Sequence, residues 1–139
     1  MADRARIIFG NDLGEAQLKK AEKAKQKNMK KFGDDSNVNY PIHLEKNPYI
    51  GDSMGVVNVL VGDLSQNAHF DPAKHPDGKL PDPVWDEEKG IIMGNIRMGF
   101  GHYRMSMAMA SCAHYMGYTP YWMDLNSYKE TTCTKWISA

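Results

Sequence analysis

The order of residue types in the segment 90–124 constrains the fold of this chain more than any other feature of its sequence. An apolar run, a glycine-rich turn, a run of helix formers rich in Ala and Met, and a second apolar run follow one another there. Apolar runs bounded by glycine are typical of buried strands. We therefore predict a strand at 90–98, a helix at 102–116 and a second strand at 118–125. Because a helix connects them, the two strands are expected to be adjacent and parallel, as in a βαβ unit.

The glycine turn of this unit is the first candidate site. Gly99 and Gly101 allow the backbone to turn sharply and to approach a ligand closely, and the N–H groups at the start of the following helix favour an anion. His102 stands at that helix start, where it can donate to a phosphate or act as a base; a histidine with no ligand is the equal alternative. Arg104 can pair with a phosphate or simply cover the sheet edge.

Asp124, at the end of the second predicted strand, completes the candidate site. An acidic residue in this place holds a ribose hydroxyl in dinucleotide-binding folds. The turn G-x-G-H lacks the third glycine of those folds, and an ordinary strand-end aspartate is the alternative interpretation. The expected ligand contacts are therefore Gly99, Gly101, His102, Arg104 and Asp124, with His102 as the candidate catalytic residue.

The run GNIRMGFGHYRMSMAMASCAHYMGYTPYWMDL resembles the opening βαβ unit of GT-B-type glycosyltransferases, especially the branch with the peptidoglycan and monogalactosyl-diacylglycerol transferases. The resemblance covers residues 90–125. The matching positions are the turn that ends in His, the small helix residues and the helix stop: Gly99, Gly101, His102, Ala108, Ala110 and Gly117. In that family the turn lines the cleft between two Rossmann-like domains, near the acceptor and the donor phosphate.

The resemblance implies an α/β fold in which residues 90–139 begin a Rossmann-like domain and residues 1–89 form an α+β N-terminal extension. The family starts with this unit and holds its sugar nucleotide mainly in a second, C-terminal domain. We therefore expect an incomplete piece of a larger protein: the acceptor-side region of a sugar-nucleotide-dependent transferase, inactive alone. The expected partners are a sugar nucleotide or another phosphate-bearing small molecule and the missing C-terminal domain, and no cofactor is expected. The alternative function is a non-catalytic binding or interaction module.

The N-terminal region is expected to contain a short strand at 6–9 and a helix at 13–32. Asp12 is the predicted N-cap of that helix, and Leu18, Ala21 and Phe32 make an apolar stripe that we expect to be buried. Seven lysines and two glutamates give residues 14–32 a net charge of +5. We favour a solvated helix face over the alternative, a partner surface for phosphates or acidic groups.

Between these regions the sequence predicts little regular structure apart from one buried strand at 56–61, VVNVLV. Residues 34–55 are turn-rich, with one short extended piece expected at 40–44, and residues 64–89 hold four prolines and are expected to form a long loop. That loop contains residue types that bind metals, namely His69, Asp71, His75 and Asp77. Their spacing matches no zinc motif, so we expect a solvated loop and no metal.

Composition excludes several classes of protein. Lys+Arg and Asp+Glu number 17 each, so no global charge favours nucleic acid as a partner. No run approaches the roughly 18 apolar residues of a membrane span, and the N-terminus lacks the apolar stretch of a signal peptide. The two cysteines do not make a disulfide scaffold. We expect a cytoplasmic protein without an integral membrane segment.

Overall fold

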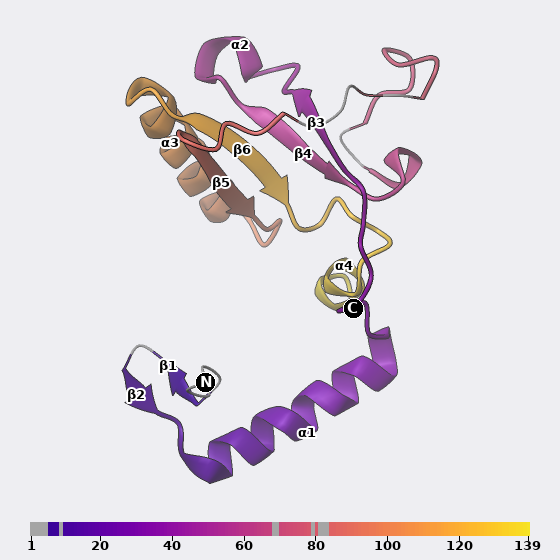
Figure 1. Cartoon of the computed structure of the whole chain (residues 1–139), viewed down its shortest axis with the longest axis vertical. Coiled ribbons are helices and arrows are strands. Elements are labelled where there is room, and N and C mark those ends of the chain that lie inside the picture. Colours follow the sequence, from indigo (N-terminus) through magenta and orange to yellow (C-terminus); the bar gives the residue numbers. More distant parts are fainter. Residues whose placement is uncertain (1–5, 9, 68–69, 79, 81–83) are drawn as a thin grey trace. The chain divides into compact units, whose positions relative to one another are not determined.

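The computed structural model describes residues 6–8, 10–67, 70–78, 80 and 84–139 (Figure 1). The chain forms two compact units, Met1–Asn37 and Val38–Ala139. Among the helices of the described residues, none combines the length and apolar character that crossing a membrane requires.

A four-stranded mixed sheet organises the unit 38–139, which makes it a mixed α/β fold. The strands are β3 (Ile42–Lys46), β4 (Val57–Val61), β5 (Gly90–Asn95) and β6 (Thr119–Asp124), in the order β3-β4-β6-β5. β3 is antiparallel to β4, whereas β6 is parallel to both β4 and β5. The remaining elements are short helices and one long one: α2 (Gly51–Met54), η1 (Leu64–Gln66), α3 (Phe100–Tyr115) and α4 (Thr132–Ile137).

The predicted strand–helix–strand unit is confirmed by β5, α3 and β6. β5 and β6 are adjacent and parallel, and α3 contacts both strands (Figure 1). β5 ends at Asn95 rather than at residue 98, because the next residues make a turn in which the Met98 N–H donates to the Ile96 carbonyl at 2.9 Å. α3 begins at Phe100, two residues earlier than expected, directly after Gly99 with its φ of 124°.

The core of this unit lies between the sheet and α3. Val56, Ala110 and Trp122 form its buried cluster, and Ile50 and Met54 pack against it. Ala110 has no exposed surface, so its small side chain allows α3 to lie close to the sheet. Ala110, one of the small helix residues in the resemblance, therefore lies in the core.

The sheet draws its strands from both sides of residue 90, where we expected the division between an extension and a domain. Val57 pairs with Tyr121 and Asn58 with Trp122, so β4 and β6 are neighbours. β6 is an inner strand, and its backbone needs a hydrogen-bonding neighbour on each edge. Residues 38–89 therefore belong to the same compact unit as residues 90–139, and the division between units falls after Asn37.

The unit 1–37 contains a small hairpin and one long helix. β1 (Ile7–Ile8) pairs with β2 (Asn11–Asp12) in an antiparallel manner. Phe9, part of the strand expected at 6–9, lies outside the described residues. The helix α1 spans Gly14–Phe32, close to the prediction, but Asp12 is not its N-cap: Leu13 takes that place, and Asp12 Oδ1 accepts from the Gly14 N–H at 2.8 Å.

The predicted burial of the apolar stripe of α1 is wrong. Every residue of α1 is described and none is buried: Leu18 and Phe32 are half-buried, and Ala21 is exposed. The strands β1 and β2 have two residues each, and this is too little apolar surface to cover the stripe of a 19-residue helix. The seven lysines of the helix are exposed, as expected.

Candidate functional site

A pocket of about 550 Å³ lies where β5 and β6 end. The last residues of these strands, Asn95 and Asp124, are register partners and both line the pocket. Gly99, at the start of α3, lines it as well. Carboxyl ends of parallel strands are a common place for ligand sites in open α/β sheets.

The walls of the pocket are apolar and mostly aromatic: Tyr49, Ile50, Phe100, Tyr103 and Trp122. Trp122, in the middle of β6, is buried, and the ring of Tyr103 meets it edge-on with the centroids 5.6 Å apart. Tyr49 and Phe100 are 90% and 83% exposed, so they stand at the rim. Flat apolar walls with a few polar groups are typical of pockets for small organic ligands.

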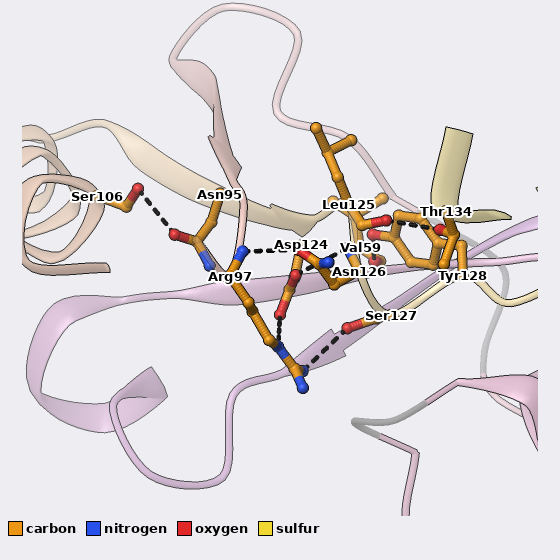
Figure 2. A network of polar contacts seen from close by, with 10 residues as sticks. All are labelled: Val59, Asn95, Arg97, Ser106, Asp124, Leu125, Asn126, Ser127, Tyr128 and Thr134. Atoms are coloured by element: carbon orange, nitrogen blue, oxygen red, sulfur yellow. Dashed lines mark hydrogen bonds and ion pairs between the residues drawn. The ribbon is translucent and has the colours of Figure 1, made fainter. Parts of the chain in front are cut away.

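Asp124 and Arg97 form an ion pair at the polar end of the pocket (Figure 2). Arg97 Nε lies 2.8 Å from Asp124 Oδ2, and the backbone N–H of Asn126 donates to Asp124 Oδ1 at 3.0 Å. Asp124 is only 3% exposed. A buried carboxylate needs such partners, because an unpaired charge in the interior is costly.

The same network holds the Arg97 segment in place. Asn126 Oδ1 accepts from the backbone N–H of Arg97 at 2.6 Å, and the Arg97 guanidinium donates to Ser127 Oγ at 3.3 Å (Figure 2). Two loops, one after β5 and one after β6, are thereby tied together. Arg97 is positioned by residues 27 to 30 positions away in the sequence.

Asn95 is the second buried polar residue of the pocket, at 4% exposure. Ser106, on the buried side of α3, donates from Oγ toward Asn95 Oδ1 at 3.4 Å (Figure 2). For the amide nitrogen Nδ2 of Asn95, no hydrogen-bond partner is found among the residues that the structure describes. The side chain is therefore oriented from α3, and its donor end is available to the pocket.

Asn47 fixes the wall of the pocket that Tyr49 and Ile50 form. Its Oδ1 accepts from the backbone N–H groups of Tyr49 and Ile50 at 2.9 and 3.0 Å, and its Nδ2 donates to Asn58 Oδ1 at 2.9 Å. Asn58 lies in β4 and is 2% exposed. The wall residues of the segment after β3 are thus fixed to the sheet.

Tyr128 anchors the segment that follows β6. Its hydroxyl donates to the carbonyl oxygen of Val59 in β4, and Thr134 Oγ1 donates to the carbonyl oxygen of Leu125 at 2.6 Å (Figure 2). Burial, and then the negative charge of Asp124, raise the pKa of Tyr128 above its ordinary value. The phenol therefore stays protonated and remains a donor to Val59.

The structure brings only part of the predicted site together. Gly99 and Asp124 both line the pocket. Gly101, His102 and Arg104 lie in the first turns of α3, all exposed, and they are not among the described residues that line it. Of the two turn glycines, only Gly99 has a positive φ, while Gly101 lies inside the helix.

The reasoning from sequence missed Asn95, Arg97 and the aromatic walls. One signal for the first two was present: they interrupt the otherwise apolar run GIIMGNIRM near its end. Polar residues at the end of a buried strand need a partner or a ligand. For Tyr49 and Tyr103, 54 positions apart, no local signal existed.

Two of the candidate metal ligands in the segment 64–89 make other contacts. His75 Nε2 lies 2.8 Å from Glu45 Oε1, and Asp71 Oδ1 accepts from the Ala73 N–H at 3.0 Å. His69 lies outside the described residues. Within the part of the chain that is described, no group of three or more His, Cys, Asp or Glu side chains is arranged to hold a metal ion.

Comparison with protein families shows one match. A family model described as "Domain of unknown function (DUF6937)" matches residues 7–139, and the chain therefore belongs to this family. No curated protein and no solved structure matches the chain.

Proposed function

We propose that this DUF6937 protein is the acceptor-side part of a glycosyltransferase-like protein that depends on a sugar nucleotide, and that it is inactive without a donor-binding domain. The observation that carries the proposal is the pocket at the carboxyl ends of β5 and β6, beside Gly99 and the start of α3. Ligands of open α/β folds bind in this place. The resemblance of residues 90–125 to the opening unit of GT-B-type enzymes adds the class of reaction.

The start of α3 supports a phosphate beside the pocket. The first N–H groups of a helix have no partners within it, and its dipole places partial positive charge there. His102 and Arg104 are exposed in the same turns and add donors, and Arg104 adds a full positive charge. In this proposal they meet the phosphate, and His102 is the candidate for proton transfer.

The proposed affinity is weak, because a helix terminus stabilises an exposed anion by only about 0.3–1 kcal/mol. Closure of a second domain over the turn would supply the remaining contacts. We therefore expect this chain, without a second domain, to bind the ligand but not to catalyse its reaction.

Titration of uridine diphosphate into the 139-residue chain tests the proposal. Tryptophan fluorescence follows binding, since one of the three tryptophans, Trp122, lines the pocket, and calorimetry confirms it. We expect His102→Ala and Arg104→Ala to weaken binding several-fold, and Gly101→Val to weaken it by blocking approach to the backbone. Lys135→Ala, which removes an exposed charge from α4, is the matched control and should bind like the wild type. Equal binding by all four variants would place the phosphate elsewhere.

A second function, a non-catalytic interaction module, is favoured by one observation on α1. At about 100° per residue, most of its lysines fall on the side of the helix opposite Leu18 and Met29. The lysines on that side are Lys19, Lys20, Lys23, Lys27, Lys30 and Lys31, all exposed. A one-sided array of this kind suits a polyanionic partner.

A further inference from the structure

We propose that the polar pair at the floor of the pocket, Asn95 and Asp124, recognises two neighbouring hydroxyl groups of an uncharged sugar ring. This inference deepens the proposed function and rests on its pocket, but it concerns the ring and not the phosphate. The source of the ring is either the ribose of a nucleoside or the sugar of a glycoside, since both present the same pair of groups.

The geometry of the pair comes from the sheet. Asn95 and Asp124 are register partners on adjacent parallel strands, which run about 4.8 Å apart. Both side chains line the pocket and both are more than nine-tenths buried. Two polar side chains are therefore held next to each other on rigid elements, with little freedom to move away from a ligand.

The chemistry of the pair is complementary. Asn95 Oδ1 already accepts from Ser106 Oγ, so its amide nitrogen is the end that can donate to a ligand. Asp124 lines the pocket as an acceptor: a carboxylate has about four acceptor sites, and Arg97 and Asn126 are two of the partners of this one. One hydroxyl would accept from Asn95 while its neighbour donates to Asp124.

The charge of the pocket favours an uncharged ring. Arg97 and Asp124 are its only charged lining residues among those described, and they neutralise each other at 2.8 Å. A phosphate at the floor would have to compete with Asp124 for Arg97. The aromatic walls, in contrast, suit the apolar faces of a sugar ring or of an attached base.

Deoxy analogues test the inference on the unaltered chain. The probes are uridine and methyl glucoside, each compared with its 2-deoxy counterpart by calorimetry and by tryptophan fluorescence. We expect at least one parent compound to bind and its deoxy counterpart to bind about 10- to 100-fold more weakly, because the buried amide of Asn95 then lacks the 2-hydroxyl as its partner. The parent that binds identifies the source of the ring.

A variant pair separates recognition from stability. Asn95→Leu should bind the parent compound and its deoxy counterpart equally weakly. Asn67→Leu is the matched control: Asn67 is also buried, donates to the Val61 carbonyl oxygen at 3.1 Å and is not among the described lining residues. Asn67→Leu should still bind the parent compound more tightly than its deoxy counterpart. If Asn95→Leu fails to fold, which thermal unfolding reveals, the wild-type comparison decides alone.

Two results would overturn the inference. One is equal binding of a parent compound and its deoxy counterpart by the wild type. The other is no binding of either uncharged parent at millimolar concentration. If uridine diphosphate still binds in the second case, the phosphate proposal survives and only the hydroxyl pair is excluded. If the uncharged ring binds and His102→Ala and Arg104→Ala leave diphosphate binding unchanged, the hydroxyl pair survives and the phosphate site at the start of α3 is excluded.

Discussion

At the scale of single residues, Tyr128 connects the segment after β6 to the neighbouring strand β4. Its hydroxyl donates to the Val59 carbonyl oxygen, and its side chain is almost completely buried. Tyr128→Phe keeps the ring and removes only this donor. The buried carbonyl then lacks this partner, which costs about 1–3 kcal/mol of unfolding free energy.

Urea denaturation at neutral pH measures this loss. Tyr115→Phe is the matched control, since Tyr115 is 92% exposed and its substitution should change stability little. A loss in Tyr128→Phe no larger than that in Tyr115→Phe would contradict the assigned role.

The raised pKa of Tyr128 adds a pH dependence to the same comparison. In the unfolded chain the phenol ionises near pH 10, whereas burial keeps it protonated to higher pH in the folded state. The stabilisation is therefore complete below about pH 10 and is lost as the pH rises through the folded pKa. We expect the wild type to lose more stability above about pH 10 than Tyr128→Phe does.

At the scale of elements, the start of α3 distinguishes its two glycines. Gly99 has a φ of 124°, which side chains of L residues rarely adopt, whereas Gly101 lies within the helix. At both positions an added Cβ would meet no atom within 4 Å, so backbone conformation alone separates them. Gly99→Ala should lower the melting temperature.

Gly101→Ala should leave the melting temperature unchanged or raise it, because alanine is favoured over glycine inside a helix by about 1 kcal/mol. Thermal unfolding of the two variants side by side checks both expectations. The opposite order of the two melting temperatures would show that the turn does not depend on the conformation of Gly99. The stability result also validates Gly101 as a position for probing ligand approach.

At the scale of the whole molecule, charge and pocket belong to different compact units. Residues 1–37 carry nine basic and six acidic residues, a net +3, and residues 38–139 carry eight and eleven, a net −3. The pocket and the whole four-stranded sheet lie in the second unit. The two proposed functions are therefore separable by truncation.

A fragment of residues 38–139 should unfold cooperatively and keep the ligand binding of the full chain, because its sheet and core are complete without residues 1–37. It should leave a heparin column at lower salt than the full chain, since the lysines of α1 are gone. Circular dichroism melts, titration and the elution salt are the three measurements. Loss of cooperative unfolding would show that the first unit contributes to the core of the second.

Local patterns in the sequence were sufficient for most elements. The helix 14–32, the strand 57–61 and the order strand–helix–strand at 90–124 follow from apolar spacing, glycine positions and helix propensity, which act over a few residues. The parallel pairing of β5 and β6 also follows, because a single helix connects them. The position of Asp124 at a strand end was visible for the same reason.

The pocket itself was decided by tertiary structure. The pairing of β4 with β6 joins segments more than 60 residues apart, and this pairing brings Asn58, and through it Asn47, to one wall of the pocket. The ion pair between Arg97 and Asp124 likewise depends on two loops meeting at one edge of the sheet. No local pattern encodes such contacts, because they arise only when distant apolar surfaces are buried against each other. Sequence alone therefore determined most of the elements and one carboxylate of the site, whereas packing decided which side chains surround it.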